Sequence, residues 1–473
     1  TSMAAAEAAA FKAKGTEFFR VDKFAEAAEQ YSKAIEKDPS DATFYSNRSA
    51  CYAALEQWPQ ALDDATQCVK LRPDWSKAYF RRALALLKVG KAVEGRAMTD
   101  AGLLLEPENR DLKELRKACI EPICRDFANA SMIDYKMDAA PSEDFKLVMK
   151  GRPPKGPELN EKAFPQTQRT MMHVAVMMQH AKVVKDMIAR GGDILKEDRM
   201  GLTALHFNAL IQHDATAAAF GDRVSEQPMS STHNATPQEM VEATAYCVQS
   251  PPVKVKVAKE DGKVEAMDSL TFLKHFGVWY QRSVQLTDEY LRCMFSSVLD
   301  EEGAELMADP RKNELTKLFK ASKEEEALGL AFISKEVGYG VFALKPFKQG
   351  DYVCSYGGVL ENSSILKDQA RSAWIFTIMA LDKLPFKTDA TLYRSFGAFL
   401  NHSDQGNLTP EHIVAKGAPM AVFVANRDIA VGEQLCYDYN GRLHTLFCQN
   451  NIPSFVALQP LAPATVQALT AAC

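Results

Sequence analysis

Four short segments in the C-terminal third carry polar and aromatic residues whose types and spacing could do chemistry. In chain order they are Gly338-Tyr339-Gly340, Tyr356-Gly357-Gly358, Asn401-His402-Ser403 and Tyr437-Asp438-Tyr439. Each alone has an ordinary structural explanation, because Gly-x-Gly and Asn-His-Ser segments are often turns and tyrosines often lie in sheets. Their order and spacing together favour one polar site.

The four segments resemble the SET domain of protein lysine methyltransferases, which shows Gly-x-Gly-x-Phe, Tyr-x-Gly, Asn-His-Ser and Phe/Tyr-Asp-Tyr in this order. The resemblance covers about a quarter of the chain, and we expect a mostly-β SET domain at residues 326–445. It implies an S-adenosyl-L-methionine-dependent protein-lysine N-methyltransferase. The substrate would be a lysine side chain of a histone, as for a chromatin regulator, or of another protein.

Lysine methylation moves a methyl group from a sulfonium to a nitrogen that must be neutral to attack. Free lysine has a pKa of about 10.4, so the site must desolvate the amine and align it. The resemblance assigns Tyr439 to the transfer point and Tyr356 to the wall of the lysine channel. Tyr437 stands where the family alternates Phe and Tyr, and its hydroxyl implies a low methylation state.

Cofactor binding is assigned by the same resemblance to two parts of the chain. Gly338 and Gly340 would let the backbone approach the cofactor, with Tyr339 as the aromatic residue between them. Asn401 and His402 would lie in a threaded crossing of the chain, a rare arrangement. Tyr439 would contact the cofactor as well as the amine.

Two departures from the family pattern concern metal binding and the end of the chain. Ala398 stands where many members have Arg, and Ser403–Asn407 lacks the usual cysteine. With no Cys-x-Cys downstream of the site, where Cys448 and Cys473 are far apart, we expect no post-SET zinc motif and no metal. The tail at residues 446–473 would then close the channel by other means, with Phe455 as a candidate.

A repeat organises the N-terminal part of the chain. Pro39, Pro73 and Pro107 are each 34 residues apart, and small and bulky residues keep the same phase between them. This pattern predicts three tetratricopeptide (TPR) repeats at residues 1–120, in which small residues let paired helices approach and the prolines end them.

Lys12, Asn47, Lys77 and Arg81 stand where TPR co-chaperones carry a carboxylate clamp. Such a clamp holds a chaperone tail ending in Glu-Glu-Val-Asp, and cations with an amide on one concave face suit carboxylate recognition. The family pattern has a second Asn where this chain has Thr16. Ordinary solvated groove residues are an equally weighted interpretation.

Two segments follow the TPR region, a linker at residues 121–164 and a second repeat at 165–250. Thr170 and His173 recur as Thr203 and His206, 33 residues on, which resembles ankyrin repeats. In that family the Thr caps a helix and the His bonds to neighbouring loops. This structural role is favoured over metal ligation by the histidines.

Residues 251–325 are expected to form a hairpin and a helical connector. The alternating run Val253–Val257 and the turn Asp261-Gly262 predict the hairpin. The segment from Leu270 to about Leu299 is predicted to be helical, with Phe272, Phe276, Trp279 and Tyr280 as core residues. The run Glu324–Glu326 is interpreted as a solvated face.

Composition limits the function classes for this multidomain α+β chain of 473 residues. A net charge of −5 favours neither nucleic acid nor an anionic membrane, and no apolar run reaches membrane-spanning length. Ten scattered cysteines favour a reducing compartment, hence the cytoplasm, the nucleus or both. The alternative to an enzyme is a TPR adaptor whose SET-like domain is silent.

Overall fold

The computed structural model describes residues 2–137, 142–161, 167–231, 233–244, 253–295, 309–362, 375–377, 386–439 and 460–472. The chain divides into two compact units, one built mainly from residues 1–126 and the other from most of the remaining chain. Among the described helices none is long and apolar enough to cross a membrane.

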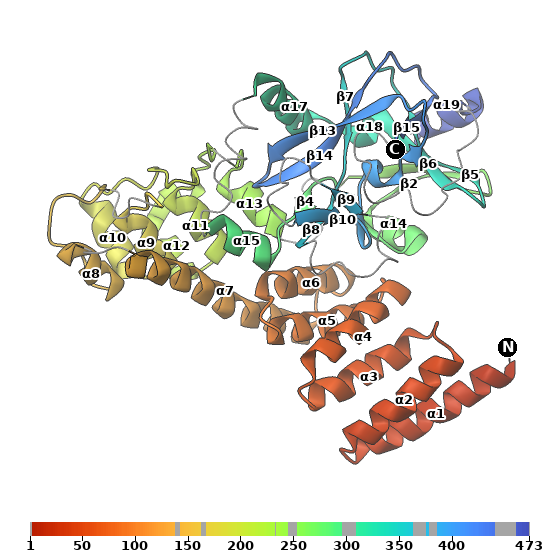
Figure 1. The fold of residues 1–473 in the computed structure, drawn as a ribbon, viewed down its shortest axis with the longest axis horizontal. Helices are drawn as coiled ribbons and strands as arrows, with labels where there is room; N and C mark the ends of the chain where they lie inside the picture. Colours follow the sequence, from red (N-terminus) through yellow and green to blue (C-terminus); the bar gives the residue numbers. More distant parts are fainter. Residues whose placement is uncertain are drawn as a thin grey trace. The chain divides into compact units, whose positions relative to one another are not determined.

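The first unit is all helical, and consecutive helices form antiparallel pairs (Figure 1). The helices are α1 (Ser2–Arg20), α2 (Phe24–Lys37), α3 (Ala42–Ala54), α4 (Trp58–Leu71), α5 (Ser76–Lys88), α6 (Ala92–Leu105) and α7 (Arg110–Met137). A Cβ on Gly15 would lie 2.9 Å from Cε1 of Tyr31, and one on Gly102 would lie 2.8 Å from Cδ1 of Leu112. These contacts confirm that the repeat uses small residues for close helix packing.

The middle of the chain also consists of short helices, and α7 extends into the expected linker. They are α8 (Glu143–Met149), α9 (Met171–Met177), α10 (Ala181–Ala189), α11 (Ala204–Ile211), α12 (Asp214–Phe220), η1 (Gly221–Ser225) and α13 (Pro237–Thr244). Thr170 and Thr203 each form a capping box with the histidine three residues on. Nε2 of His173 bonds to Leu202 O at 3.1 Å, and Nε2 of His206 bonds to Ala235 O at 2.9 Å. Both histidines therefore have the structural role predicted for them.

The expected hairpin is present, but the single helix after it is not. The elements are β1 (Val255–Ala258), β2 (Val264–Met267), α14 (Ser269–Phe276), β3 (Trp279–Tyr280), β4 (Val284–Gln285), α15 (Asp288–Phe295), α17 (Pro310–Ala321) and α18 (Glu324–Ala327). Gly277, at φ +70°, follows the end of α14, a conformation that terminates helices. Trp279 and Tyr280 then pair with β11 in parallel, so strand pairing replaces the predicted helix.

The C-terminal region is mostly β, as expected for its fold class. Its strands are β5 (Leu328–Ser334), β6 (Gly338–Ala343), β7 (Tyr352–Ser355), β8 (Gly358–Asn362), β9 (Ile375–Thr377), β10 (Phe386–Asp389), β11 (Tyr393–Arg394), β12 (Asn401–His402), β13 (Leu408–Ala415), β14 (Ala418–Ala425) and β15 (Gln434–Tyr437), with η4 (Phe396–Phe399) and α19 (Pro463–Ala471).

Within the described residues, nine strands form one sheet in the order β2-β1-β5-β6-β15-β13-β14-β7, with β12 paired to β15. A second sheet has the order β4-β8-β10-β9. Strand β14 is buried along its whole length and forms much of the core between them. Helix α19 packs its Leu469 against Ala258, Ala331 and Phe342, whereas Phe455 and Cys448 of the tail lie outside the described residues.

Candidate active site

The pairing of β12 with β15 brings two of the four segments together. The strands run parallel, with Asn401 opposite Cys436 and His402 opposite Tyr437. The Ser403 N–H donates to Tyr437 O at 3.1 Å. A Cβ on Gly406 would lie 2.6 Å from the Tyr437 Cα, so this approach of two backbones requires glycine.

Tyr439 is fixed at both its backbone and its hydroxyl. Its N–H donates to Nδ1 of His402 at 3.2 Å, and its hydroxyl donates to the carbonyl of Leu400. The Tyr439 ring lies 4.6 Å from the Tyr437 ring and 5.2 Å from the His402 ring, centroid to centroid. The structure therefore places Tyr437, Tyr439 and His402 in one cluster.

The hydroxyls of this cluster are neutral. Burial raises the pKa of Tyr356, Tyr437 and Tyr439 above the ordinary tyrosine value, and the neighbouring Tyr439 raises that of Tyr356 and Tyr437 further. The hydroxyls thus donate and accept hydrogen bonds but do not act as anionic bases near neutral pH.

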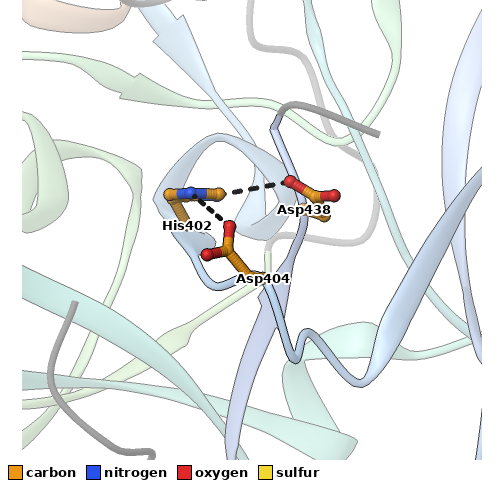
Figure 2. A group of neighbouring side chains, drawn as sticks. All are labelled: His402, Asp404 and Asp438. Atoms are coloured by element: carbon orange, nitrogen blue, oxygen red, sulfur yellow. Dashed lines mark ion pairs between the residues drawn. The ribbon is translucent and has the colours of Figure 1, made fainter. Parts of the chain in front are cut away.

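His402 lies between two carboxylates, Asp404 and Asp438 (Figure 2). Its Nε2 is 3.1 Å from Asp404 Oδ1, and its Nδ1 is 3.8 Å from Asp438 Oδ1. Because Nδ1 accepts the Tyr439 N–H, Nε2 is the ring nitrogen that carries a proton, and it faces Asp404.

The same three residues are a candidate cation group within the described part of the chain, since one ligand atom of each lies within 4.8 Å of the others. A metal on Nε2 would displace the proton to Nδ1, where it would face the Tyr439 N–H. The hydrogen bonds therefore favour a histidine that orients Tyr439 over a metal ligand.

The first glycine segment lies beside Asn401. Nδ2 of Asn401 donates to Tyr339 O at 3.3 Å. A Cβ on Gly340 would lie 2.9 Å from this Nδ2 and 2.6 Å from Ile333 Cδ1, while Gly338 has φ +77° with open space around it. Tyr339 joins the site through its backbone, because its ring packs on Phe332 at 5.5 Å.

Tyr356, at 5% exposure, follows the end of β7, and one serine, Ser395, holds both of its flanking residues. Ser395 Oγ donates to Ser355 O at 2.6 Å and accepts the Gly357 N–H at 2.7 Å. The Tyr356 N–H donates to Ala421 O at 2.9 Å. No role was predicted for Ser395 from the sequence, although it directly precedes the apolar run before Asn401.

Asn407 is a second residue that the sequence did not single out. It is fully buried, donates from Nδ2 to Gln434 O at 2.9 Å and accepts the Cys436 N–H on Oδ1 at 3.0 Å. Strand β13 pairs with β15 at Leu408 and Tyr437 alone among the described residues. The Asn407 side chain therefore makes the hydrogen bonds to the β15 backbone that a longer pairing of β13 with β15 would otherwise provide.

The TPR groove residues form a second candidate site, considered within the first unit. Burial lowers the pKa of both Lys77 and Arg81, and the Arg81 charge lowers that of Lys77 further. Nε of Arg81 is buried and has no hydrogen-bond partner among the described residues. Two cations that repel each other, one with an unused donor, are well suited to receive an anion.

Lys12 and Asn47 are already engaged by the protein itself. Lys12 Nζ donates to Thr43 Oγ1 at 2.7 Å, and Asn47 hydrogen-bonds to the Tyr31 hydroxyl. Thr16 Oγ1 donates to Lys12 O at 2.9 Å and lies 3.1 Å from the Tyr31 hydroxyl. Thr16 therefore packs within its own helix pair.

Comparison with known proteins identifies the two kinds of domain that contain these residues. The sheet and tyrosine cluster define a domain of the SET class, and the SET domain model matches residues 338–440. The chain carries a SET domain preceded by N-terminal TPR repeats.

The TPR region is similar to curated co-chaperones. It is 36% identical over 110 residues to the Hsp70-Hsp90 organizing protein of Triticum aestivum, covering 23% of this chain and 19% of that protein. It is 40% identical over 110 residues to the STIP1 homolog of Dictyostelium discoideum, covering 23% and 20%. The chain thus spans about a fifth of the length of these relatives.

A solved structure, the first TPR of Spaghetti (RPAP3) bound to the HSP90 peptide SRMEEVD, is 32% identical. It has a TM-score of 0.24 and covers 24% of this chain and 91% of that one.

Proposed function

We propose that this chain is an S-adenosyl-L-methionine-dependent protein-lysine N-methyltransferase of low methylation state, acting on a histone or another protein. The observation that carries the proposal is the fixed, neutral Tyr439, whose hydroxyl bonds to Leu400 O beside His402 and Asn401 in a SET domain. The presence of all three matched residues favours the enzyme over a silent domain.

The residues present fit a sulfonium cofactor. The carbonyls of Leu400 and Tyr339, the Tyr439 hydroxyl and the Tyr437 and Tyr439 ring faces are electron-rich groups that suit a cation. Asn401, His402 and the Gly338–Gly340 backbone would hold the cofactor. When bound, it supplies an activated methyl group.

The protein's own contribution is to desolvate and orient the amine. The buried Tyr356 and Phe423 and the half-buried Tyr437 would give the approach of the amine an aromatic lining, which disfavours the charged ammonium form of a lysine side chain. Neutral tyrosine oxygens then accept hydrogen bonds from the amine and fix the direction of its lone pair. Loss of the proton precedes attack, because only the neutral amine is nucleophilic.

Incubation of the full chain with methyl-labelled cofactor and cell lysate tests the proposal. We expect a labelled protein band that is lost in Tyr439→Phe and retained in the control Tyr45→Phe, whose hydroxyl is part of the TPR unit. No labelled band from any lysate, with folded protein, would contradict the enzyme and favour the adaptor.

The methylation state has its own test. In Tyr437→Phe the nitrogen loses a crowding hydroxyl, so we expect the ratio of di- to monomethylated product to rise, measured by mass spectrometry of an acceptor peptide. An unchanged ratio would refute the steric role of Tyr437.

We further propose that the TPR groove binds the acidic C-terminus of a heat-shock chaperone, in keeping with the names of the Hsp70-Hsp90 organizing relatives. The buried, unpartnered Arg81 Nε and its neighbour Lys77 support this proposal. Fluorescence anisotropy with a peptide ending in Glu-Glu-Val-Asp tests it. Binding should be lost with an amidated C-terminus or in Arg81→Ala, and retained in Lys33→Ala, an exposed control on α2.

The remaining parts fit a recruiting role. We propose that the helix pairs carrying His173 and His206 are ankyrin-like interaction repeats, supported by their 33-residue spacing and capping boxes. Residence in the cytoplasm, the nucleus or both remains part of the proposal, and fractionation of cells expressing a tagged chain tests it.

A further inference from the structure

The acidic run Glu324–Glu326 in α18 was interpreted from its composition as a solvated face. That interpretation is wrong for its first two residues. Glu324 is 1% exposed and Glu325 is 8% exposed. Of the three glutamates, Glu326 pairs with exposed lysines at the surface, Lys323 at 3.1 Å and Lys345 at 3.6 Å. A carboxylate is buried only where specific partners hold it, so Glu324 requires an explanation.

Three donors converge on one oxygen of Glu324. Its Oε1 accepts from Arg282 Nε at 3.2 Å and from the Tyr352 hydroxyl, and it shares the single hydroxyl hydrogen of Ser355, whose Oγ is 3.1 Å away, with Arg282 O. Its Oε2 is buried and has no hydrogen-bond partner among the described residues. Two of the three donors, Tyr352 and Ser355, are therefore the first and last residues of β7, and the third, Arg282, comes from the segment between β3 and β4.

Arg282 is itself held in place from a different direction. Its Nη1 donates to Ser322 O at 2.9 Å, and its Nη2 donates to Phe319 O at 2.9 Å and Ser322 Oγ at 2.7 Å. Ser355 Oγ also lies 2.8 Å from Arg282 O. The ion pair is consequently fixed to the end of α17. Because Ser355 contacts both partners of the pair, its position is restricted as well.

Ser355 directly precedes Tyr356, and the backbone after it is equally confined. A Cβ on Gly357 would lie 2.0 Å from Gln281 O, the residue before Arg282. Ser395 closes the other side through Ser355 O and the Gly357 N–H. Tyr356 thus lies between two residues, Ser355 and Gly357, that buried polar contacts hold in place. A shift of Ser355 would therefore move the Tyr356 ring.

We propose that Glu324 is a positioning residue for the amine channel: held by Arg282, it fixes Ser355 and so sets the place of the Tyr356 ring. Nothing in the four matched segments indicates this role. The proposal rests on the methyltransferase function for its kinetic consequence, but the placement of Tyr356 is a property of the folded protein and can be measured without turnover.

The structural test uses the full chain with 3-fluorotyrosine incorporated at position 356 and a fluorine NMR spectrum. Glu324→Gln and Ser355→Ala should each shift or broaden the resonance, whereas Glu326→Gln should leave it unchanged. Ser355→Ala keeps the Glu324–Arg282 ion pair, so it reports on the link even if Glu324→Gln folds poorly. An unchanged resonance in folded Ser355→Ala would overturn the proposal.

The kinetic test separates positioning from stability. In Glu324→Gln and Ser355→Ala we expect kcat to fall about ten-fold while the Kd for S-adenosyl-L-methionine stays the same, because misplacing a channel wall affects alignment. The double variant should lose little more than either single one. Additive losses, or an equal loss of cofactor binding, would refute positioning. Absence of turnover in the wild type would instead refute the proposed function and leave the NMR result to stand alone.

Discussion

Acidification should loosen the helix pairs of the middle segment, because buried histidines hold them together in the neutral form. Burial lowers the pKa of His173 to about 3 and that of His233 to about 4. Both pKa values in the folded protein lie below the ordinary histidine pKa of 6.5. As the pH falls, the unfolded chain therefore binds protons that the folded chain does not. Their stabilising effect is present above pH 6.5 and is lost as the pH falls towards 4.

Asp198 acts in the opposite direction. Burial raises its pKa to about 6, from 3.8, so the folded state binds its proton first and gains stability on acidification. From pH 7.5 to 5.0 each of the two histidines removes about 2 kcal/mol and Asp198 restores about 1 kcal/mol. The net loss is about 2–3 kcal/mol. Burial also lowers the pKa of His206, which adds to the loss.

Hydrogen exchange of the full chain at the two pH values measures this effect locally. After correction for the intrinsic exchange rate, amides of α9 and α11 should be roughly 70-fold less protected at pH 5.0, which is the same free energy expressed as a ratio. Helices α2 and α4 are the internal control, because residues 1–126 contain no histidine. Equal protection of α9 at both pH values would refute the assignment of buried neutral histidines.

Three further changes test contacts described above. Thr16→Asn should tighten binding of an acidic peptide about ten-fold by adding an amide to the groove, measured by anisotropy; weaker binding would show that the Thr16 bonds to Lys12 and Tyr31 matter more. Gly340→Ala should lower stability by about 1–3 kcal/mol and weaken cofactor binding through Asn401; an unchanged cofactor affinity, by calorimetry, would contradict this. Asn407→Ala should destabilise the chain by about 2–4 kcal/mol in thermal unfolding, since it leaves the buried Gln434 O and Cys436 N–H unpaired; an unchanged midpoint would count against the bridging role.

The parts of the fold that were predictable from the sequence are those that local pattern determines. The same pattern of small and bulky residues recurs three times at the 34-residue spacing of Pro39, Pro73 and Pro107. The repeat can therefore be recognised from the sequence alone. The histidines at 173 and 206 follow the same logic, because a capping box is complete within four residues. The hairpin at Asp261-Gly262 is also a local signal.

The errors arose where distant partners decide the outcome. The aromatic pair at 279 and 280 forms a strand because β11, more than a hundred residues later, supplies its pairing. The acidic run at 324 is buried because Arg282 and Tyr352 approach it from other elements. In the site, the matched segments identified Asn401, His402 and Tyr439, but Ser395 and Asn407 act through backbone groups that no spacing rule reveals.

The hairpin of β13 and β14 joins the two site strands, and its tip is attached well outside the residues that match the family. The Gly417 N–H donates to His233 O at 3.1 Å, and the Tyr290 hydroxyl donates to Gly417 O at 3.3 Å. Strands β5, β4 and β3, which also lie outside that match, pair with β6, β8 and β11. A fragment cut at residues 338 and 440 would therefore lose the supports of this hairpin and expose three strand edges, so truncation studies should begin upstream of His233.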